Sequence, residues 1–298
     1  MDSILRITEK TGAFRAFVAD TTQLVGKSVG IHGLTPTAAA AIGRTLTAVS
    51  MMGLDLKSEA ESISIQINGD GPIGSIVTVA DCHGNVRGYL DNPNVDLPLK
   101  NNKLDVSGAV GNGFLTIVRN MGLKEPYIGR VELQTGEIAE DIAYYFMSSQ
   151  QIPSVVALGV LVDVDYTIKA AGGYIIQLLP GADEEIISKL EANVYTLESV
   201  TEMLSKGLDV RGMTRELLLG FEYDILLEAK PEYKCNCSRE RMERALISLG
   251  KDELMSIISE EGKAELNCQF CKKSYMFDKP QLESLLKSAK GERHEKNI

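Results

Sequence analysis

The sequence TPTAAAAIGRTLTAVSMM, at residues 35–52, predicts a helix that is buried on every side. Pro36 suits the first turn of a helix, where the backbone N–H groups have no partners within the helix. Arg44 is the only charged side chain in the stretch, and small or apolar side chains surround the rest of the helix axis. A helix that is apolar all round normally packs inside a protein core. We therefore expect this helix to lie between layers of β-sheet.

Strand patterns flank this helix on both sides in the sequence. Residues 62–67, SISIQI, alternate strictly between polar and apolar side chains, which is typical of a half-buried strand. Short turns that contain glycine join neighbouring strands into a hairpin and an antiparallel meander. The expected strands are residues 3–8, 13–20, 62–67, 75–80, 86–90, 114–119, 155–162 and 166–179, the last interrupted by Gly172-Gly173. Together with a helix at residues 137–147, a loop at residues 91–113 and no regular βαβ alternation, they predict an α+β fold with mixed or antiparallel sheets around the buried helix.

The sequence pattern changes from that of strands to that of amphipathic helices after Pro180-Gly181. Acidic residues from Asp183 onward begin an amphipathic helix, as the helix dipole favours, and Gly207 is expected to end it. A second amphipathic helix is expected at residues 214–227. Residues 182–234 therefore predict a helical linker whose apolar side must cover either the first domain or a partner chain.

Composition and charge restrict the possible partners. The chain has 298 residues and a formal net charge of −10, so phosphate backbones and anionic lipids repel it and neither nucleic acid nor a membrane is an expected partner. It contains only three histidines, which makes histidine-based catalysis unpromising. The N-terminus lacks the apolar stretch of a signal peptide, and no run is long enough to span a membrane. We expect a cytoplasmic protein with reduced thiols.

Four of the five cysteines form two close pairs in the last 64 residues, Cys235-Asn236-Cys237 and Cys268-Gln269-Phe270-Cys271. Four thiolates in two pairs suit a tetrahedral zinc ion. The surrounding sequence predicts a small zinc-binding module at residues 235–298, with a helix capped by Ser238 and a last helix begun by Asp278 and Gln281. Two short strands, at residues 264–267 and 274–277, bracket the second pair, and the tail from residue 290 is expected to be solvated.

The spacing of the cysteines allows two interpretations, an inert structural zinc site and a reactive zinc site. Structural zinc ribbons usually carry two CxxC pairs, whereas here one pair is CxC. A module of this size obtains roughly 3–5 kcal/mol from its own core. Structural zinc contributes roughly 10–16 kcal/mol in small fingers. Oxidation of the thiolates would therefore eject the metal and unfold the module, and this loss could extend into the linker and expose its apolar side.

The paired cysteine pattern resembles that of the heat-shock protein 33 family of redox-regulated chaperones. Other stretches are similar to that family too, and together they extend over essentially the whole chain: residues 36–50 with Gly43-Arg44-Thr45, residues 71–74, residues 103–106 and residues 170–181. One departure lies within residues 104–112, where Ser107-Gly108 replaces a more basic pair.

The resemblance implies a chaperone without enzymatic activity and without catalytic residues. It implies a core for client binding and dimerisation at residues 1–181, the linker at residues 182–234, and a redox switch at residues 235–298. One zinc per chain, on Cys235, Cys237, Cys268 and Cys271, would keep the reduced form inactive. Peroxide with heat, or hypochlorite, would form Cys235–Cys237 and Cys268–Cys271 disulfides and release zinc. The first of these disulfides would close a very small loop, which suits a reversible redox state better than a structural crosslink.

By the same resemblance, the oxidised protein would hold unfolding client proteins without ATP during oxidative and heat stress. It would act as a homodimer, and it would hand its clients over to ATP-dependent chaperones.

Two other functions fit parts of the sequence. The Cys268–Cys271 pair suggests a thiol–disulfide oxidoreductase, but it lacks a thioredoxin-like βαβ setting. A zinc ribbon that binds nucleic acid or ribosomes is compatible with the basic residues around the cysteines, but the acidic remainder of the chain argues against it.

Two weaker motifs favour structural interpretations. Gly26-Lys27-Ser28-Val29-Gly30 matches a hydrolase elbow, but it lies in a predicted helix and not at a strand-to-helix turn. Cys82-His83 is a turn with one isolated thiol, although oxidation at Cys82 remains open.

Overall fold

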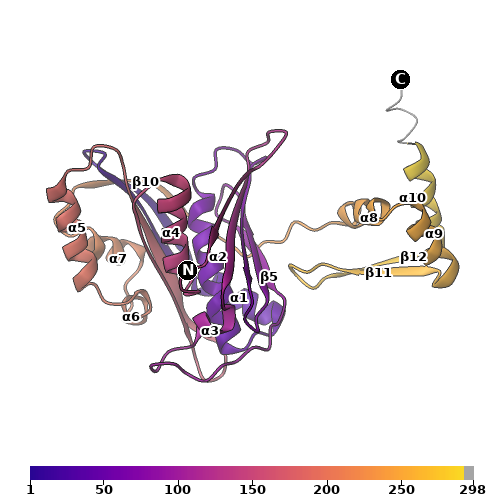
Figure 1. Cartoon of the computed structure of the whole chain (residues 1–298), viewed down its shortest axis with the longest axis horizontal. Coiled ribbons are helices and arrows are strands. Elements are labelled where there is room, and N and C mark those ends of the chain that lie inside the picture. The colour runs from indigo at the N-terminus through magenta and orange to yellow at the C-terminus, as the bar shows by residue number, and fades with distance from the viewer. Residues whose placement is uncertain (292–298) are drawn as a thin grey trace. The chain divides into compact units, whose positions relative to one another are not determined.

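The structure, a computed structural model, describes residues 1–291, so the expected solvated tail lies largely outside the described residues. The chain divides into two compact units, which we call unit 1 (Met1–Lys234) and unit 2 (from Cys235 onward). Figure 1 shows the elements of both. No helix of the described part of the chain is long and apolar enough to cross a membrane.

Unit 1 contains two five-stranded sheets in which every neighbouring pair of strands is antiparallel. We call them the N-terminal sheet and the meander sheet. In strand order, the N-terminal sheet consists of β10 (Tyr223–Ala229), β1 (Ser3–Glu9), β2 (Phe14–Asp20), β9 (Ile168–Leu178) and β8 (Ser154–Val162). The meander sheet consists of β5 (Val86–Leu90), β4 (Ser75–Ala80), β3 (Ser62–Gly69), β6 (Gly113–Asn120) and β7 (Tyr127–Glu132). The predicted α+β class, hairpin and meander are confirmed.

Helix α2 (Pro36–Gly53) lies between the two sheets, as its sequence predicts. It contacts β8 and β9 of one sheet and β3, β4 and β5 of the other, and from Thr37 to Gly53 only Arg44 is not fully buried. The Arg44 guanidinium is neutralised by Glu137, whose carboxylate lies 2.6 Å away. Gly43 allows the close approach of its neighbours, because a Cβ there would lie 2.8 Å from Val25 and 2.9 Å from Val160. The segments that carry Val25 and Val160 therefore pack directly on the surface of α2 at Gly43.

Other parts of unit 1 differ in detail from the sequence predictions. Strand β9 is continuous through Gly172-Gly173, because the missing side chains let it approach the carbonyls of Ala19 and Ala157 on the two neighbouring strands. The segment expected to be a loop, residues 91–113, contains the short helix α3 (Val106–Val110). Strand β7, at the edge of the meander sheet, was not predicted. Gly108, in the segment that departs from the family pattern, lies against the Asp105 carboxylate that caps α3. Helix α1 (Thr22–His32) packs against α2, and α4 (Ala139–Gln150) packs against β8 and β7.

Three short helices cover the face of the N-terminal sheet that points away from α2: α5 (Glu184–Thr196), α6 (Val200–Ser205) and α7 (Val210–Leu217). Alternation along β2 sends Phe17 and Ala19 toward α2, and Phe14, Ala16 and Val18 toward these helices. Among the buried residues of the covering helices are Leu190, Met203 and Leu217. The apolar side of the predicted linker therefore covers the first domain.

The predicted helix at residues 214–227 was wrong. Helix α7 ends at Leu217, Gly220 adopts a φ of 76°, and the chain continues as strand β10, which pairs with β1. The predicted helix that ends at Gly207 is instead two helices, because Ser199 and Glu202 form a capping box that begins α6. The predicted linker, residues 182–234, thus contains three helices and an edge strand of the N-terminal sheet.

The last residues of unit 1 are anchored beside β5 in what we call the Tyr233 clasp. Tyr233 is 3% exposed, and its hydroxyl donates to the Gly88 carbonyl at 2.7 Å. The Val86 N–H donates to the Glu232 carbonyl at 2.9 Å, and the Lys234 N–H donates to the Val86 carbonyl at 2.7 Å. These bonds fix the backbone up to the residue before Cys235.

Unit 2 contains the hairpin β11 (Lys263–Asn267) and β12 (Ser274–Asp278) and three helices, α8 (Arg239–Ser248), α9 (Lys251–Glu260) and α10 (Lys279–Gly291). The Ser238 cap, the hairpin and the Asp278–Gln281 cap are confirmed, whereas α9 was not predicted. Its core is small. Among the described residues, the buried members of its apolar cluster are Leu246, Leu254, Ala264, Tyr275, Phe277 and Leu282.

The turn between β1 and β2 yields a pH-dependent prediction. The Glu9 carboxylate, in a residue 5% exposed, accepts hydrogen bonds from the Thr11 N–H at 2.8 Å, the Thr11 hydroxyl at 2.5 Å and the Ala13 N–H at 3.2 Å. Burial alone would raise the pKa of this carboxyl, but the hydrogen bonds outweigh it and lower the pKa. Because the folded pKa is depressed, the contribution to stability is present above the unfolded pKa and is lost as the pH falls through the folded value.

We expect Glu9→Gln to lower the free energy of unfolding of unit 1 by roughly 1–2 kcal/mol at pH 7, and by progressively less as the pH falls from the pKa of an ordinary Glu, about 4.3, toward the lower folded value. Urea unfolding of both proteins at pH 7 and pH 3.5 measures this. Glu222→Gln, which removes a largely exposed carboxylate just before the neighbouring strand β10, is the control. An equal loss for Glu9→Gln at both pH values would contradict the prediction.

Candidate metal centre

The structure brings the four clustered cysteines of unit 2 together. Cys235 and Cys237 precede helix α8, and Cys268 and Cys271 lie in the turn between β11 and β12. Their four sulfur atoms all lie within 4.8 Å of one another, and the group could hold a metal ion. All five cysteines of the chain are free thiols.

The CxxC pair is positioned by a hydrogen-bonded turn. The Cys268 N–H donates to the Lys273 carbonyl at 3.0 Å, and the Lys272 N–H donates to the Cys268 carbonyl at 2.8 Å. Lys272 has a φ of 59°, the left-handed conformation that closes this turn. The hairpin register, in which Asn267 opposes Ser274, fixes both ends of the loop that carries the two thiols.

The CxC pair is positioned by the start of helix α8. The Ser238 hydroxyl caps the helix by accepting from the Arg241 N–H at 3.3 Å, and Arg241 Nη1 donates to Asn236 Oδ1 at 2.6 Å. Arg239 connects the same helix to the hairpin, because its guanidinium lies 4.3 Å from the centre of the Phe277 ring and donates to the Met276 carbonyl at 3.1 Å. The two cysteine pairs are therefore held by elements that bond to each other.

The sulfur separations fit a tetrahedral metal. Cys235 Sγ lies 3.7 Å from Cys268 Sγ, and Cys237 Sγ lies 3.4 Å from Cys271 Sγ. A zinc ion with four sulfur ligands at about 2.3 Å places neighbouring sulfurs roughly 3.8 Å apart, whereas a disulfide places them about 2.05 Å apart. Four soft thiolates in this geometry suit zinc rather than a hard cation such as calcium or magnesium.

The thiols of the cluster differ in acidity. Burial tends to raise the pKa of Cys237, but hydrogen bonds from the Tyr275 hydroxyl, at 3.1 Å, and from the neighbouring thiols bring it down to about 7. Burial raises the pKa values of Cys235 and Cys271. The hydrogen bond to Cys237 is also the main reason that the pKa of Tyr275 rises to about 12. Cys237 thus loses its proton more readily than Cys235 or Cys271, and the thiolate is the form that binds metal or reacts with an oxidant.

The weaker motifs of the sequence do not form sites in unit 1. Ser28 lies inside helix α1 and not at a strand-to-helix turn, and His32 contacts the Tyr233 hydroxyl at 3.0 Å. Burial and the neighbouring Asp81 carboxylate raise the pKa of Cys82, which disfavours its thiolate. The contribution of Tyr275 to the cluster was not predicted, although its place in the strand after the CxxC pair was a usable signal.

Comparisons with known proteins by sequence and by structure all match a single family. A family model described as Hsp33 protein matches residues 2–278. A protein named 33 kDa chaperonin from Ruminiclostridium cellulolyticum is 48% identical over 96% of this chain and 98% of its own length. A protein of the same name from Alkaliphilus oremlandii is 51% identical over 95% of this chain and 96% of its own. The crystal structure of the 33 kDa chaperonin from Thermotoga maritima superposes with a TM-score of 0.87 at 35% identity, over 96% of this chain and 98% of that one.

Proposed function

This chain belongs to the Hsp33 family of 33 kDa chaperonins, and from that premise we propose that it is a redox-regulated holdase that binds unfolding proteins without ATP. The observation that carries the proposal is the convergence of four free thiols, two of them in a CxC pair, in a unit with a very small core. The stability of such a unit depends on what its cysteines bind.

In the reduced state, Cys235, Cys237, Cys268 and Cys271 would hold one zinc ion, which supplies the crosslink that the small core of unit 2 needs. Structural zinc contributes roughly 10–16 kcal/mol to small modules. Arg239, Arg241 and the hairpin turn orient the thiolates, and Tyr275 donates to Cys237. The reduced protein is inactive in this proposal because unit 2 is folded.

Oxidation would replace the thiolate ligands by two disulfides, Cys235–Cys237 and Cys268–Cys271. Each disulfide forms as two thiolates lose two electrons, and each hydrogen peroxide takes up two electrons and two protons to give two waters. Two peroxides per chain therefore consume all four ligands and release the zinc. Disulfide sulfurs are weak ligands compared with thiolates, so the metal does not remain bound.

The client-binding surface in this proposal lies under helices α5, α6 and α7. These helices cover buried apolar residues of the N-terminal sheet, including Leu5, Ile7, Phe14, Val18 and Ile176. Detachment of residues 182–234 after the loss of zinc would expose this face, and a large exposed apolar patch is a binding surface for other proteins. The functional parts would then be a core at residues 1–181, a linker at residues 182–234 and the switch from residue 235 onward.

The remaining parts of the proposal follow the family. The active protein would be a cytoplasmic homodimer that works under oxidative and heat stress and hands clients over to ATP-dependent chaperones. The proposal includes no enzymatic activity. In support, the CxxC pair lies in a hairpin turn and not at a helix N-terminus, where helix dipoles activate redox cysteines.

Aggregation of a thermally unfolding client enzyme tests the function. Light scattering is followed with reduced, zinc-loaded protein and with protein oxidised by peroxide at an elevated temperature. We expect the oxidised form to suppress scattering at near-equimolar amounts and the reduced form to have little effect. Equal suppression by both forms would reject the redox control, and no suppression by either would reject the holdase. Turnover in insulin reduction would instead support an oxidoreductase.

A conservative change at Tyr275 tests its part in the centre. We expect Tyr275→Phe to weaken zinc binding by roughly 10-fold, because second-shell hydrogen bonds to metal ligands typically contribute 10–100-fold to affinity. Competition with a chromogenic chelator at pH 7.5 measures this. Tyr195→Phe, at a 91% exposed tyrosine of helix α5, is the matched control. Identical affinities for Tyr275→Phe and the wild type would show that the hydroxyl does not assist the thiolates.

A further inference from the structure

The Tyr233 clasp closes the outer edge of the meander sheet. Strand β5 lies at this edge beside β4, and an edge strand presents backbone N–H and C=O groups that can pair with another chain. Tyr233 forms a parallel bridge with Val86. The Val86 N–H donates to the Glu232 carbonyl, and the Val86 carbonyl accepts from the Lys234 N–H. Residues 232–234 thus pair with β5 as a short additional strand.

The side chains of the clasp alternate as they do along a strand. Pro231 and Tyr233 are buried, whereas Glu232 and Lys234 are exposed. This is the period of two that an extended chain has when one of its sides is covered. Many proteins bind peptides by adding such an extended segment to a sheet edge, with backbone hydrogen bonds for affinity and alternate side chains for specificity. The chain's own segment therefore occupies the β5 edge in the way that a bound peptide would.

The Tyr233 ring is buried among apolar side chains, and its hydroxyl pairs with the backbone of the edge strand. The ring belongs to the apolar cluster that surrounds α2. The hydroxyl donates to the Gly88 carbonyl at 2.7 Å, accepts from the Gly88 N–H at 3.3 Å, and lies 3.0 Å from His32 Nε2. A tyrosine fits this position better than a phenylalanine, because phenylalanine would leave the two Gly88 groups without this partner.

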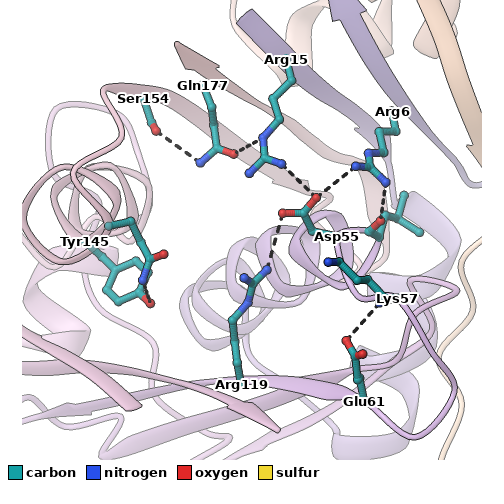
Figure 2. Close-up of polar contacts among 11 residues, drawn as sticks. Arg6, Arg15, Asp55, Lys57, Glu61, Arg119, Tyr145, Ser154 and Gln177 are labelled. Carbon is teal, nitrogen blue, oxygen red and sulfur yellow. Dashed lines mark hydrogen bonds and ion pairs between the residues drawn. The ribbon is translucent and has the colours of Figure 1, made fainter. Parts of the chain in front are cut away.

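The meander sheet is tied to the N-terminal sheet by contacts that do not involve the linker (Figure 2). Asp55 Oδ1 lies 3.0 Å from Arg15 Nη1 on β2 and 3.3 Å from Arg6 Nη2 on β1. Asp55 Oδ2 lies 3.6 Å from Arg119 Nη2 on β6 of the meander sheet. We call these four residues the arginine cluster. Their side chains are only partly accessible, so water screens the charges less than on an open surface. We therefore expect β5 to keep its place in unit 1 if the linker detaches.

We propose that the β5 edge binds an extended segment of an unfolded client protein, with a tyrosine of the client in the place of Tyr233, once the clasp has opened. This is a second client site, on the other sheet from the face that α5, α6 and α7 cover. In the reduced protein the clasp competes with clients from within the same chain and keeps the edge closed. The opening step rests on the proposed redox function, whereas the site itself does not.

The contacts of the clasp favour an unfolded chain over a folded partner. They use backbone groups and one aromatic side chain, and the exposed side chains of Glu232 and Lys234 impose little on the neighbouring residues of a ligand. Folded proteins pair their buried backbone groups internally, whereas an unfolded chain offers them in extended stretches. A site of this kind therefore suits clients of diverse sequence that have lost their structure.

Amide NMR of the full-length, reduced and zinc-loaded Tyr233→Ala variant tests the site without oxidation. The probe is a capped peptide with the sequence of residues 229–234, AKPEYK. We expect saturable shifts of the Val86 and Gly88 amides with a Kd of roughly 1 mM, since the cost of association offsets most of the gain from one ring and a few hydrogen bonds. A probe with phenylalanine for tyrosine should bind roughly 5–10-fold more weakly, and a probe with alanine should not saturate.

Tyr195→Ala is the matched control, because it removes an exposed tyrosine of the linker and leaves the clasp closed. This variant and the wild type should show no shifts of the β5 amides in reductant. Three results would overturn the site: no saturation with the tyrosine probe, equal binding of the alanine probe, or shifts confined to amides away from β5.

Oxidised wild-type protein provides a second test, in case Tyr233→Ala does not fold. Hydrogen exchange of the Lys234 amide, which donates to Val86, reports whether the clasp has opened, and suppression of client aggregation is measured on the same sample. An open clasp should bind the three probes with the same order of affinities. An open clasp without preference for tyrosine would overturn the site. A clasp that stays closed in protein that suppresses aggregation would overturn the proposal but not the holdase.

A second copy of this chain is the alternative occupant, because each copy carries the same clasp segment. Gel filtration of the oxidised protein, with and without an excess of the tyrosine probe, distinguishes the two. We expect no change in the oligomeric state, and a peptide of unrelated sequence with one tyrosine between β-branched residues should bind about as tightly as the probe. Dissociation of oxidised dimers by the probe, or no binding of the unrelated peptide, would overturn the assignment to clients.

Discussion

Cys268→Ser is expected to weaken zinc binding by roughly 100- to 1,000-fold, because about a quarter of the roughly 10–16 kcal/mol from four ligands is lost. Cys268 is 5% exposed, so the substitution also leaves a hydroxyl in a position that favours a thiolate. The apolar core of unit 2 is too small to compensate, since modules of this size obtain only roughly 3–5 kcal/mol from their cores. We therefore expect residues 235–291 to lose their stable fold while unit 1 keeps its own.

Zinc stoichiometry after gel filtration and amide hydrogen exchange measure this prediction together. Cys82→Ser is the matched control, because it removes the one cysteine outside the cluster and should leave both readouts unchanged. Full zinc content in Cys268→Ser would contradict the assignment of this ligand. A variant that contains no zinc, but whose amides in unit 2 remain protected from hydrogen exchange, would contradict the dependence of the fold of unit 2 on the metal.

Leu217→Asp is expected to make the reduced, zinc-loaded protein an active holdase. Leu217 is 1% exposed on α7 and packs with the apolar residues that the covering helices share with the N-terminal sheet. A carboxylate without a partner in that interface costs several kcal/mol. This cost disappears if α7 and its neighbouring helices leave the sheet, because the carboxylate then reaches water. The same movement exposes the surface that we propose for client binding. Suppression of client aggregation in reductant should rise to nearly the level of oxidised wild-type protein.

Leu219→Asp is the matched control, because it adds the same charge two residues away at a position that is 66% exposed. It should remain inactive in reductant. Hydrogen exchange identifies the cause, since α5, α6 and α7 should lose protection in Leu217→Asp while α2 retains it. Loss of protection in these three helices without any suppression of aggregation would place the client surface elsewhere.

The parts of the fold that the sequence predicts are those encoded by local pattern. The uniform apolar composition of residues 35–52 requires burial from every direction, and only a position between two layers provides it. The alternation of residues 62–67 defines one buried and one partly exposed side of β3. The spacing of the cysteines restricts their geometry strongly, because a tetrahedral site accepts few arrangements of two close pairs.

The parts that the sequence does not predict depend on contacts between distant segments. Residues 223–229 are apolar enough for a helix or a strand, and the free edge of β1 decides in favour of β10. The arginine cluster joins positions 6, 15, 55 and 119, and no spacing along the chain relates them. Tyr275 becomes part of the cysteine cluster only because the hairpin brings β12 beside the CxxC turn.

In the proposed mechanism, the Tyr233 clasp would separate the loss of zinc from the release of the covering helices. Unravelling that begins in unit 2 reaches Lys234, where two backbone hydrogen bonds to Val86 and the buried Tyr233 ring oppose further progress. Opening the clasp would thus need free energy of its own, and the covering helices would stay in place after an oxidant pulse that is too brief or too cool to open it. Heat would supply this free energy, so the proposed holdase would respond to the coincidence of oxidation and heat.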